Sequence, residues 1–469
     1  MTDFVTSMDV LQVAGRETPH AEAVASSTRA DAIDVRLDRS SVTRIQALLI
    51  AVCALGLAMD SMEMSMGGAF AAIFSAPPNA VTPRALSWLL SAVYIGAISG
   101  APIGGWMGDK YGRRISMIVV LVALTVTSII AAFTPGFDAL VLSRVLSGIA
   151  FGAFPPLMMA YLADFLPSHR RGMFVLVVSG LSLLGPPAGI FLIHWLNPIR
   201  PLGFDAWRWA LLLGGACSAL AAWLARKVPE SPRWLAAKGR FADAEAACDL
   251  VESSPVMYRL EPPMAVLGAG SRSGTGATIH AASSTRLSLK RMAMVGALFF
   301  LSPWSIVAFP LLSGALLIQK GVRLSDTLFY LALSTLGPIL GTVVAAFGID
   351  RLERRLTLGL CALGIFVAGA VFMAASQPIW LVASSFTLSL CVSLYIPTIN
   401  IYASELFAPA IRARAVSRAW TMNRMGAAAA PIVLIPILGA GGPTVMFGVI
   451  GLALGLSVLV LVFSPKANG

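Results

Sequence analysis

The chain has 469 residues, of which 57% are hydrophobic and 12% are charged. Soluble domains carry about 25% charged residues, so this composition excludes an ordinary soluble protein. The net charge of +11 does not indicate a nucleic-acid partner, because most basic residues fall in short loops that alternate along the chain. The 5 cysteines have no CxxC spacing, which argues against a disulfide or metal framework.

The polar segment 1–44 is predicted to be a cytoplasmic tail. It contains scattered arginines and lacks the apolar core of a cleavable signal peptide. Within it, the stretch from Ile33 to Arg39 has the pattern of a short helix that lies at the membrane surface. A disordered tail is the alternative.

Twelve apolar stretches follow, each close to or above the roughly 20 residues that cross a bilayer as a helix. The predicted spans are 45–75, 86–107, 115–134, 138–165, 173–196, 207–226, 291–318, 325–347, 355–375, 379–405, 413–438 and 443–464. The loops after spans 2, 4, 6, 8 and 10 hold most of the Lys and Arg residues. By the positive-inside rule, both termini are cytoplasmic. We therefore expect an all-α, multi-pass protein of the cell (inner) membrane.

The spans form two groups of six, joined by a polar segment. The predicted domains are an N-terminal tail (1–44), a first six-helix bundle (45–226), a cytoplasmic linker (227–290), a second six-helix bundle (291–464) and a C-terminus (465–469). The linker holds an amphipathic helical pattern from Gly239 to Val251, followed by a stretch rich in Gly, Ser, Ala and Thr.

The two bundles are related by an internal repeat. An offset of 241 residues aligns Asp109 on Asp350 and Tyr161 on Tyr402. The register holds without a gap from the second span of each half to the fifth. Duplicated halves in a membrane protein indicate a transporter whose site lies between them.

A charged loop occupies matching positions in the two halves and is predicted to be a cytoplasmic gate. We expect Asp109 to accept hydrogen bonds from a neighbouring helix N-terminus. Arg113 and Arg114 are expected to bind carboxylates and so stabilise the outward-facing state. The alternative is that these basic residues only set the topology. The predicted gate residues are Asp109, Arg113, Arg114, Asp164, Arg171, Asp350, Arg354, Arg355, Glu405 and Arg412.

The second copy of the loop departs from the first. Glu353 stands where the first copy has Gly112. We therefore expect the gate of the second half to be weaker.

The loop from Gly105 to Arg114 resembles the signature of the major facilitator superfamily. Three further segments resemble the sugar-porter branch of that superfamily: Arg144 to Gly172, Pro229 to Leu235, and Tyr395 to Arg412. The resemblance implies the fold of this superfamily, with twelve helices in two pseudo-symmetric bundles, and transport by alternating access.

Within this branch, span 1 is more similar to aromatic acid and niacin-type metabolite:proton symporters than to sugar porters. The segment from Arg36 to Arg39 resembles their Arg-Leu-Asp-Arg element. The segment from Asp60 to Glu63 resembles their Asp-Gly-Tyr-Asp element, with Ser-Met in place of Gly-Tyr and Glu in place of the second Asp. Spans 7 and 10 lack the paired glutamines and the Gly-Pro…Trp element of sugar porters, although Asn400 is one candidate amide.

Two carboxylates lie inside span 1, where an acidic residue costs about 2.5–3.5 kcal/mol. Asp60 and Glu63 are three residues apart and share a helix face. Helix rise puts Glu63 about 28 Å along span 1 and Arg144 roughly 10 Å into span 4 from the outer side, so the two can meet. The matching positions form the coupling pair in proton-coupled sugar porters. The predicted proton-coupling residues are Asp60, Glu63 and Arg144, with a structural role as the alternative.

Span 11 contains Arg424, roughly 18 Å from its cytoplasmic end. An arginine inside a span indicates a functional site, and its planar guanidinium suits a carboxylate. It resembles the span 11 arginine of organic-anion carriers, and a structural pair with Asp60 or another carboxylate is the alternative. The predicted substrate-binding residues are Arg424, Asn400, Tyr395, Trp304, Trp420 and Asn423.

Together these features predict a secondary active transporter, preferably a proton-coupled symporter of a small aromatic or heteroaromatic carboxylate. The alternatives are a proton-driven drug or metabolite exporter, a sugar porter, and a non-transporting receptor built on the same fold.

No phosphate-binding loop, metal-ligand spacing or covalent nucleophile is present, so we expect no enzymatic activity, cofactor or metal. The expected partners are the substrate, protons and the lipid bilayer, and we expect a monomer that binds no nucleic acid. Substrate identity, transport direction and proton stoichiometry stay open.

Overall fold

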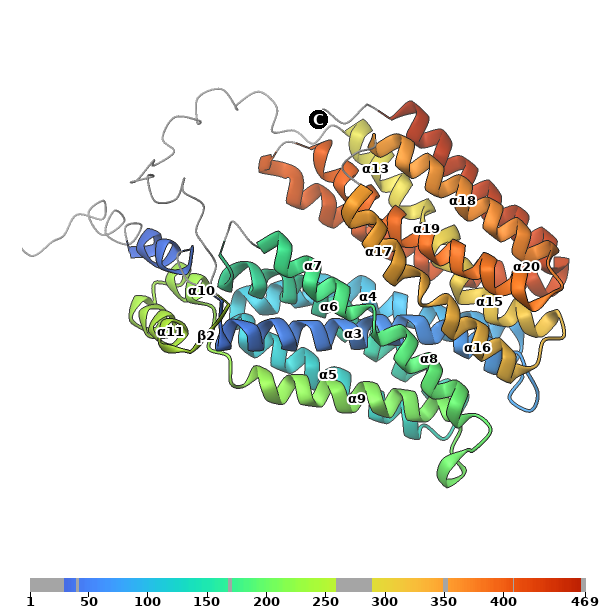
Figure 1. Ribbon diagram of the computed structural model, residues 1–469, viewed down its shortest axis with the longest axis horizontal. Helices are drawn as coiled ribbons and strands as arrows, with labels where there is room; N and C mark the ends of the chain where they lie inside the picture. The colour runs from blue at the N-terminus through green and yellow to red at the C-terminus, as the bar shows by residue number, and fades with distance from the viewer. Residues whose placement is uncertain are drawn as a thin grey trace, which may run out of the picture.

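The structure, a computed structural model, describes residues 29–38, 42–167, 171–258, 289–348, 353–407 and 409–464. Within these ranges it is helical apart from loops and one antiparallel pair of short strands, β1 (Val42–Thr43) and β2 (Val256–Tyr258). Two helical bundles lie side by side, the first in blue to green and the second in yellow to red (Figure 1).

The first bundle contains six helical segments long and apolar enough to cross a membrane. Its helices are α3 (Arg44–Ile73), α4 (Pro83–Tyr111), α5 (Arg113–Phe133), α6 (Phe137–Phe165), α7 (Arg171–Ser182), α8 (Gly185–Leu196) and α9 (Ala206–Ala225), with a 3-10 turn, η2 (Pro201–Gly203), before α9. Helices α7 and α8 form one span. The helix is interrupted between them because Pro186 and Pro187 have no amide hydrogen to bond the preceding turn.

The second bundle contains five such segments among the described residues. Its helices are α13 (Leu289–Leu301), α14 (Pro303–Ile306), α15 (Ala308–Gln319), α16 (Leu324–Ser334), α17 (Gly337–Gly348), α18 (Arg354–Ala374), α19 (Pro378–Glu405) and α20 (Pro409–Phe463). Helices α13 to α15 form one span that breaks at Pro303, and α16 and α17 form another.

Helix α20 accounts for the last two predicted spans. It has 55 residues, about 80 Å of helix, which is more than twice the hydrocarbon thickness of a bilayer. Gly442 has a φ of +75°, outside the helical region, and the following Pro443 lacks an amide hydrogen. The chain therefore reverses here without a loop, and the two crossings predicted as 413–438 and 443–464 meet at this break.

Small residues let helices of one bundle approach closely. On α4, a Cβ added at Gly96 or Gly100 would overlap the backbone of α6, and one added at Gly148 on α6 would overlap α4. The repeat mates Gly337 and Gly341 on α17 face α19 in the same way. Spacing of small residues by four positions is typical of helix pairs in membranes. Positions related by the sequence repeat therefore make the same close helix contacts in both bundles.

The described contacts between the two bundles lie toward one end of the molecule. Helix α3 contacts α15 and α16, α4 contacts α20, and α8 contacts α16. Gly68 approaches the carbonyl of Pro310, and the Nδ1 atom of His194 lies 3.0 Å from the carbonyl oxygen of Ser325. In Figure 1 the bundles meet at this end and diverge toward the other. We call the meeting end the opposite face.

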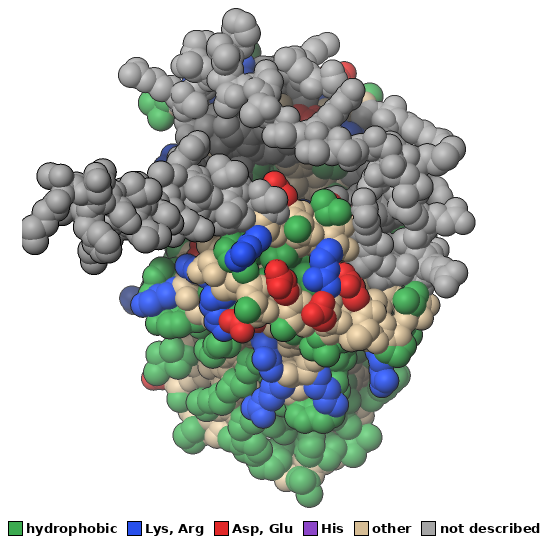
Figure 2. Space-filling model, turned by 90° about the vertical axis from the view of Figure 1, so that its left-hand side faces the viewer, with side chains coloured by type: hydrophobic (Ala, Val, Ile, Leu, Met, Phe, Trp, Pro, Cys, Tyr) green, Lys and Arg blue, Asp and Glu red, His purple; other side chains and the backbone are tan. Residues whose placement is uncertain are grey.

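The other end, which we call the basic face, carries the charged loops at Lys110 to Arg114 and Arg354–Arg355. It also carries the linker helices α10 (Pro232–Ala237) and α11 (Phe241–Ser253). Figure 2 shows this face, where basic and acidic side chains gather, while hydrophobic side chains cover the flank.

Residues 29–38 form a helix, here called the tail helix, that packs on α10 and α11. Ile33 and Leu37 are each 2% exposed against Leu235 and Cys248. The short helix predicted from Ile33 to Arg39 is present in the described residues 29–38, and it contacts the linker.

Candidate functional site

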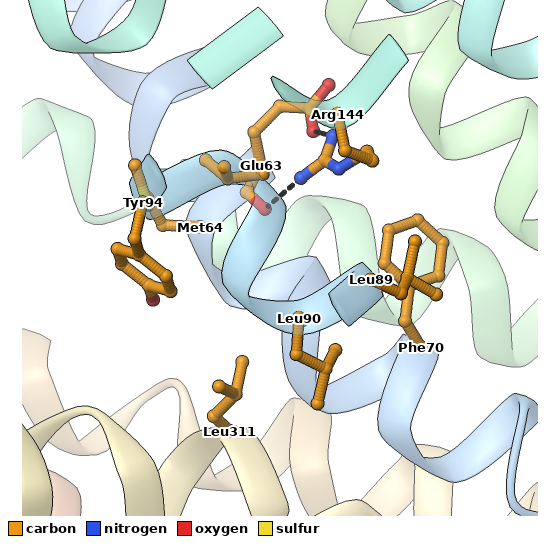
Figure 3. Close-up of a pocket in the computed structure, with 10 residues that line it drawn as sticks. Glu63, Met64, Phe70, Leu89, Leu90, Tyr94, Arg144 and Leu311 are labelled. Carbon is orange, nitrogen blue, oxygen red and sulfur yellow. Dashed lines mark hydrogen bonds and ion pairs between the residues drawn. The ribbon is translucent and has the colours of Figure 1, made fainter. Parts of the chain in front are cut away.

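Glu63 on α3 and Arg144 on α6 form a buried ion pair. Each residue is 2% exposed. One guanidinium nitrogen of Arg144 donates to Oε2 of Glu63, and a second lies 3.4 Å from the Glu63 carbonyl oxygen (Figure 3). The Ser128 hydroxyl on α5 donates to Oε1 of Glu63 at 3.3 Å, and the guanidinium lies 5.4 Å from the ring centre of Phe70. Both carboxylate oxygens are therefore occupied.

The cavity beside this pair is very small. It holds about 10 Å³ and is lined by Met64, Tyr94 and Leu311 among others (Figure 3). This is close to the least space that one water molecule needs. The structure brings Glu63 and Arg144 together as the sequence predicted, beside a cavity with no room for a substrate.

Asp60 lies on the same face of α3, three residues before Glu63. It is 8% exposed, and its buried Oδ1 atom has no hydrogen-bond partner among the described residues. Arg424, from the second bundle, and Glu63 are the charged groups described near it. Buried carboxylates are normally paired or hydrogen-bonded, so an unpartnered one calls for an explanation.

Arg424 on α20 is partly buried and has no carboxylate within 4.0 Å among the described residues. Its guanidinium lies 5.9 Å from the ring centre of Trp420. The Trp420 indole N–H donates to Oδ1 of Asn400 at 2.9 Å, which links α20 to α19. Three of the six predicted substrate-binding residues thus form one cluster.

The other three predicted substrate-binding residues differ from one another. Trp304 on α14 is partly buried, and its indole nitrogen is buried without a partner among the described residues. Tyr395 on α19 is 3% exposed. Asn423 turns its amide toward α13, donating at 3.2 Å to both the Phe299 carbonyl and the Ser302 hydroxyl. These two hydrogen bonds stabilise the chain where the helix is interrupted between α13 and α14. The sequence pattern did not indicate this role for Asn423.

The charged loop of the first half forms ion pairs at the basic face. Arg113 donates to Asp109 at 2.7 Å and to Asp164 at 3.3 Å. Arg114 donates to the carbonyl oxygen of Arg226 at 2.5 Å, and Arg171 donates to that of Leu166 at 3.2 Å. Arg113 thus binds Asp164 as expected, whereas the bonds described for Arg114 and Arg171 go to backbone oxygens.

In the second half, Arg354 lies 3.5 Å from Glu405, and Arg355 donates to the carbonyl oxygen of Val462 at 2.7 Å. Asp350 and the side chain of Arg412 lie outside the described residues. The pair of the second half is longer than both bonds of Arg113.

The carboxylate at the N-terminus of α5 is Glu230, whereas the bond described for the Asp109 side chain comes from the guanidinium of Arg113. Glu230 accepts from the backbone amides of Arg113 at 2.8 Å and Arg114 at 3.0 Å. The partial positive charge of a helix N-terminus stabilises an anion there. Gly112, with a φ of +99°, is needed because a Cβ would overlap Glu230. Glu230 lies within the Pro229–Leu235 segment, which was noted in the sequence but given no role.

Comparison with known proteins establishes the family. A family model described as "Sugar (and other) transporter" matches residues 58–469, so the chain belongs to this family. It is similar to the niacin transporter NiaP of Acinetobacter baylyi (24% identity, 91% of this chain, 96% of that protein). It is also similar to the inner membrane metabolite transport protein YdjE of Escherichia coli (25% identity, 92% and 95%).

The fold matches solved structures as well. The xylose transporter XylE of E. coli in its inward open conformation aligns with a TM-score of 0.69, covering 90% of this chain and 96% of that one at 19% identity. The predicted fold is therefore confirmed. The chain is therefore a multi-pass membrane protein of the "Sugar (and other) transporter" family.

Proposed function

We propose that this protein is a proton-coupled symporter of a small aromatic or heteroaromatic carboxylate. The observation that carries the proposal is Arg424, an arginine inside a membrane span with no described carboxylate within 4.0 Å. A free guanidinium at this depth is costly unless an anion binds it. Its planar fork suits a carboxylate, and the adjoining Trp420 ring offers a flat surface to an aromatic substrate.

Coupling to protons is proposed to involve the carboxylates of α3. Asp60 and Glu63 share a helix face, and Arg144 balances Glu63. The name of the relative NiaP, a niacin transporter, fits a pyridine carboxylate. That relationship is distant, so niacin serves here as a test compound and not as the assigned substrate.

The basic face is proposed to lie in the cytoplasm, with both termini on that side. The bundles 45–226 and 291–464 would move against each other as two units. The ion pairs of Arg113 and Arg354 would then form and break during the cycle, acting as a gate. The positive-inside rule supports this orientation.

Uptake into proteoliposomes tests the proposal. Arg424→Ala removes the anion partner, and we expect it to reduce uptake of radiolabelled nicotinate or benzoate at least about tenfold, because a hydrogen bond to a charged group contributes about 1.5–3 kcal/mol. Arg323→Ala, at an exposed arginine on the opposite face, is the matched control and should transport like the wild type. Undiminished acid uptake by Arg424→Ala would remove the basis of the proposal.

A sugar porter is the second candidate, since the family model and the xylose transporter structure both include sugar carriers. The same vesicles should be offered labelled D-xylose. Uptake of the sugar that is unchanged in Arg424→Ala, without uptake of acids, would favour this candidate.

A further inference from the structure

The two carboxylates of α3 differ in whether they are free to exchange a proton. Glu63 has both carboxylate oxygens bonded, and the adjoining cavity has room for about one water molecule. Breaking this pair would leave Arg144 buried without a counter-charge, which is strongly destabilising. The Glu63–Arg144 pair is therefore suited to a fixed role within the first bundle.

The Asp60 carboxylate, in contrast to that of Glu63, is not held by an ion pair with any described residue of its own bundle. Its Oδ1 atom has no hydrogen-bond partner in the described part of the chain, and it lies near the interface between the halves, where Arg424 of α20 acts on it electrostatically. The other titratable groups near it are Glu63 on its own helix and Tyr94 on α4. Arg144, which lies near Tyr94, is engaged by Glu63, so within the part of the chain that the structure describes Arg424 is the positive charge available to balance Asp60.

We propose that Asp60 carries the transported proton, and that the substrate anion and ionised Asp60 compete for the charge of Arg424. This inference rests on the proposed function. In the empty site, ionised Asp60 and Arg424 sum to zero charge. When a monocarboxylate binds Arg424, Asp60 loses its counter-charge and takes a proton from water. The loaded site is again neutral.

Charge balance fixes the stoichiometry. An anion with one negative charge and one proton enter together, and both leave together on the other side. An ionised carboxylate without a counter-charge is strongly disfavoured away from water, so binding of the anion without the proton is suppressed. The proton moves from water to the Asp60 carboxylate and back, and no other group need change its protonation state.

Asp60→Asn separates coupling from binding. The side chain keeps its shape and loses the proton site. We expect this variant to keep counterflow of labelled nicotinate or benzoate, and to lose accumulation driven by an imposed pH gradient. Wild type should accumulate the acid up to about tenfold per pH unit, since one unit equals 1.36 kcal/mol. Asp326→Asn, at an exposed acid near the opposite face, should keep both activities.

A second measurement needs no variant. On adding nicotinate to purified wild type in unbuffered solution, a pH-sensitive dye should report uptake of one proton per anion bound. Binding without proton uptake would overturn the inference, even if Asp60→Asn failed to fold.

The remaining outcomes distinguish failure of this inference from failure of the proposed function. If Asp60→Asn still accumulates the acid against its gradient, or if it loses counterflow while staying folded, Asp60 is not the coupling group and the inference fails alone. If the wild type shows no counterflow with any acid of a monocarboxylate panel, the proposed function fails, and the inference fails with it.

Discussion

Three carboxylates of the first half and the linker illustrate how differently a negative charge can be balanced. Glu63 is balanced by the guanidinium of Arg144. Glu230 is balanced by backbone amides at the start of α5. Asp60 has a buried oxygen with no described partner. The first two carboxylates join neighbouring segments of the chain, whereas Asp60 is the group that we propose to take up the proton.

Gly112→Ala should destabilise the charged loop. The new methyl group would overlap the Glu230 carboxylate, and alanine at a φ of +99° is strained, at a cost of about 1–3 kcal/mol. We expect a lower melting temperature in detergent. Gly105→Ala is the matched control, since nothing lies within 4 Å of its added Cβ. Equal melting temperatures for the two variants would show that the Glu230 contact adds no stability.

The sequence indicated some of these residues and not others, for physical reasons. Glu63 and Arg144 could be paired because the helix rise gives depth directly. The role of Glu230 could not be found in this way, because its contact with Arg113 spans 117 residues and depends on how the chain returns after α9. Asn423 looked like a ligand because polar residues in spans often are, but its amide is used where Pro303 interrupts the helix.

At the scale of elements, the tail helix, α10 and α11 form a small layer at the basic face. Arg36 pairs with Asp249 at 2.6 Å and with Glu252 at 2.7 Å. These pairs are partly exposed, and such pairs contribute at most about 1 kcal/mol. The apolar contacts of Ile33 and Leu37 are therefore the main stabilising term, although the polar sequence of the tail gave little sign of them.

Cys248 on α11 reports whether the tail helix is docked. Burial raises the pKa of its thiol to about 11, so little reactive thiolate is present at neutral pH. Ile33→Asp should release the tail helix, lower this pKa toward its ordinary value and speed maleimide labelling roughly a hundredfold. Labelling of docked protein should rise with pH as the thiol ionises.

The labelling experiment uses a chain in which Cys248 is the one remaining cysteine. Val35→Asp is the matched control, because Val35 is on the same helix and 48% exposed. If Ile33→Asp labels no faster than Val35→Asp, the tail helix does not cover this thiol in solution.

At the scale of the whole molecule, the two halves contact each other at the opposite face. At the basic face, ion pairs form within each half. Where both members of an ion pair are described, they belong to the same half, tail and linker counted with the first, as Arg113 with Asp164 and Arg354 with Glu405. Hydropathy predicted the spans well, but it could not predict the direct reversal at Gly442, which depends on one backbone conformation.

The most direct test of the central claim compares two ligands that differ in one charge. Nicotinate and nicotinamide share a pyridine ring, but only nicotinate has a carboxylate. Binding to purified wild type should be measured by isothermal titration calorimetry. A site built around Arg424 predicts that nicotinate binds at least about tenfold more tightly than nicotinamide, and that Arg424→Ala removes the difference. Equal affinity for the two ligands, or binding of D-xylose with no binding of the acid, would contradict the account.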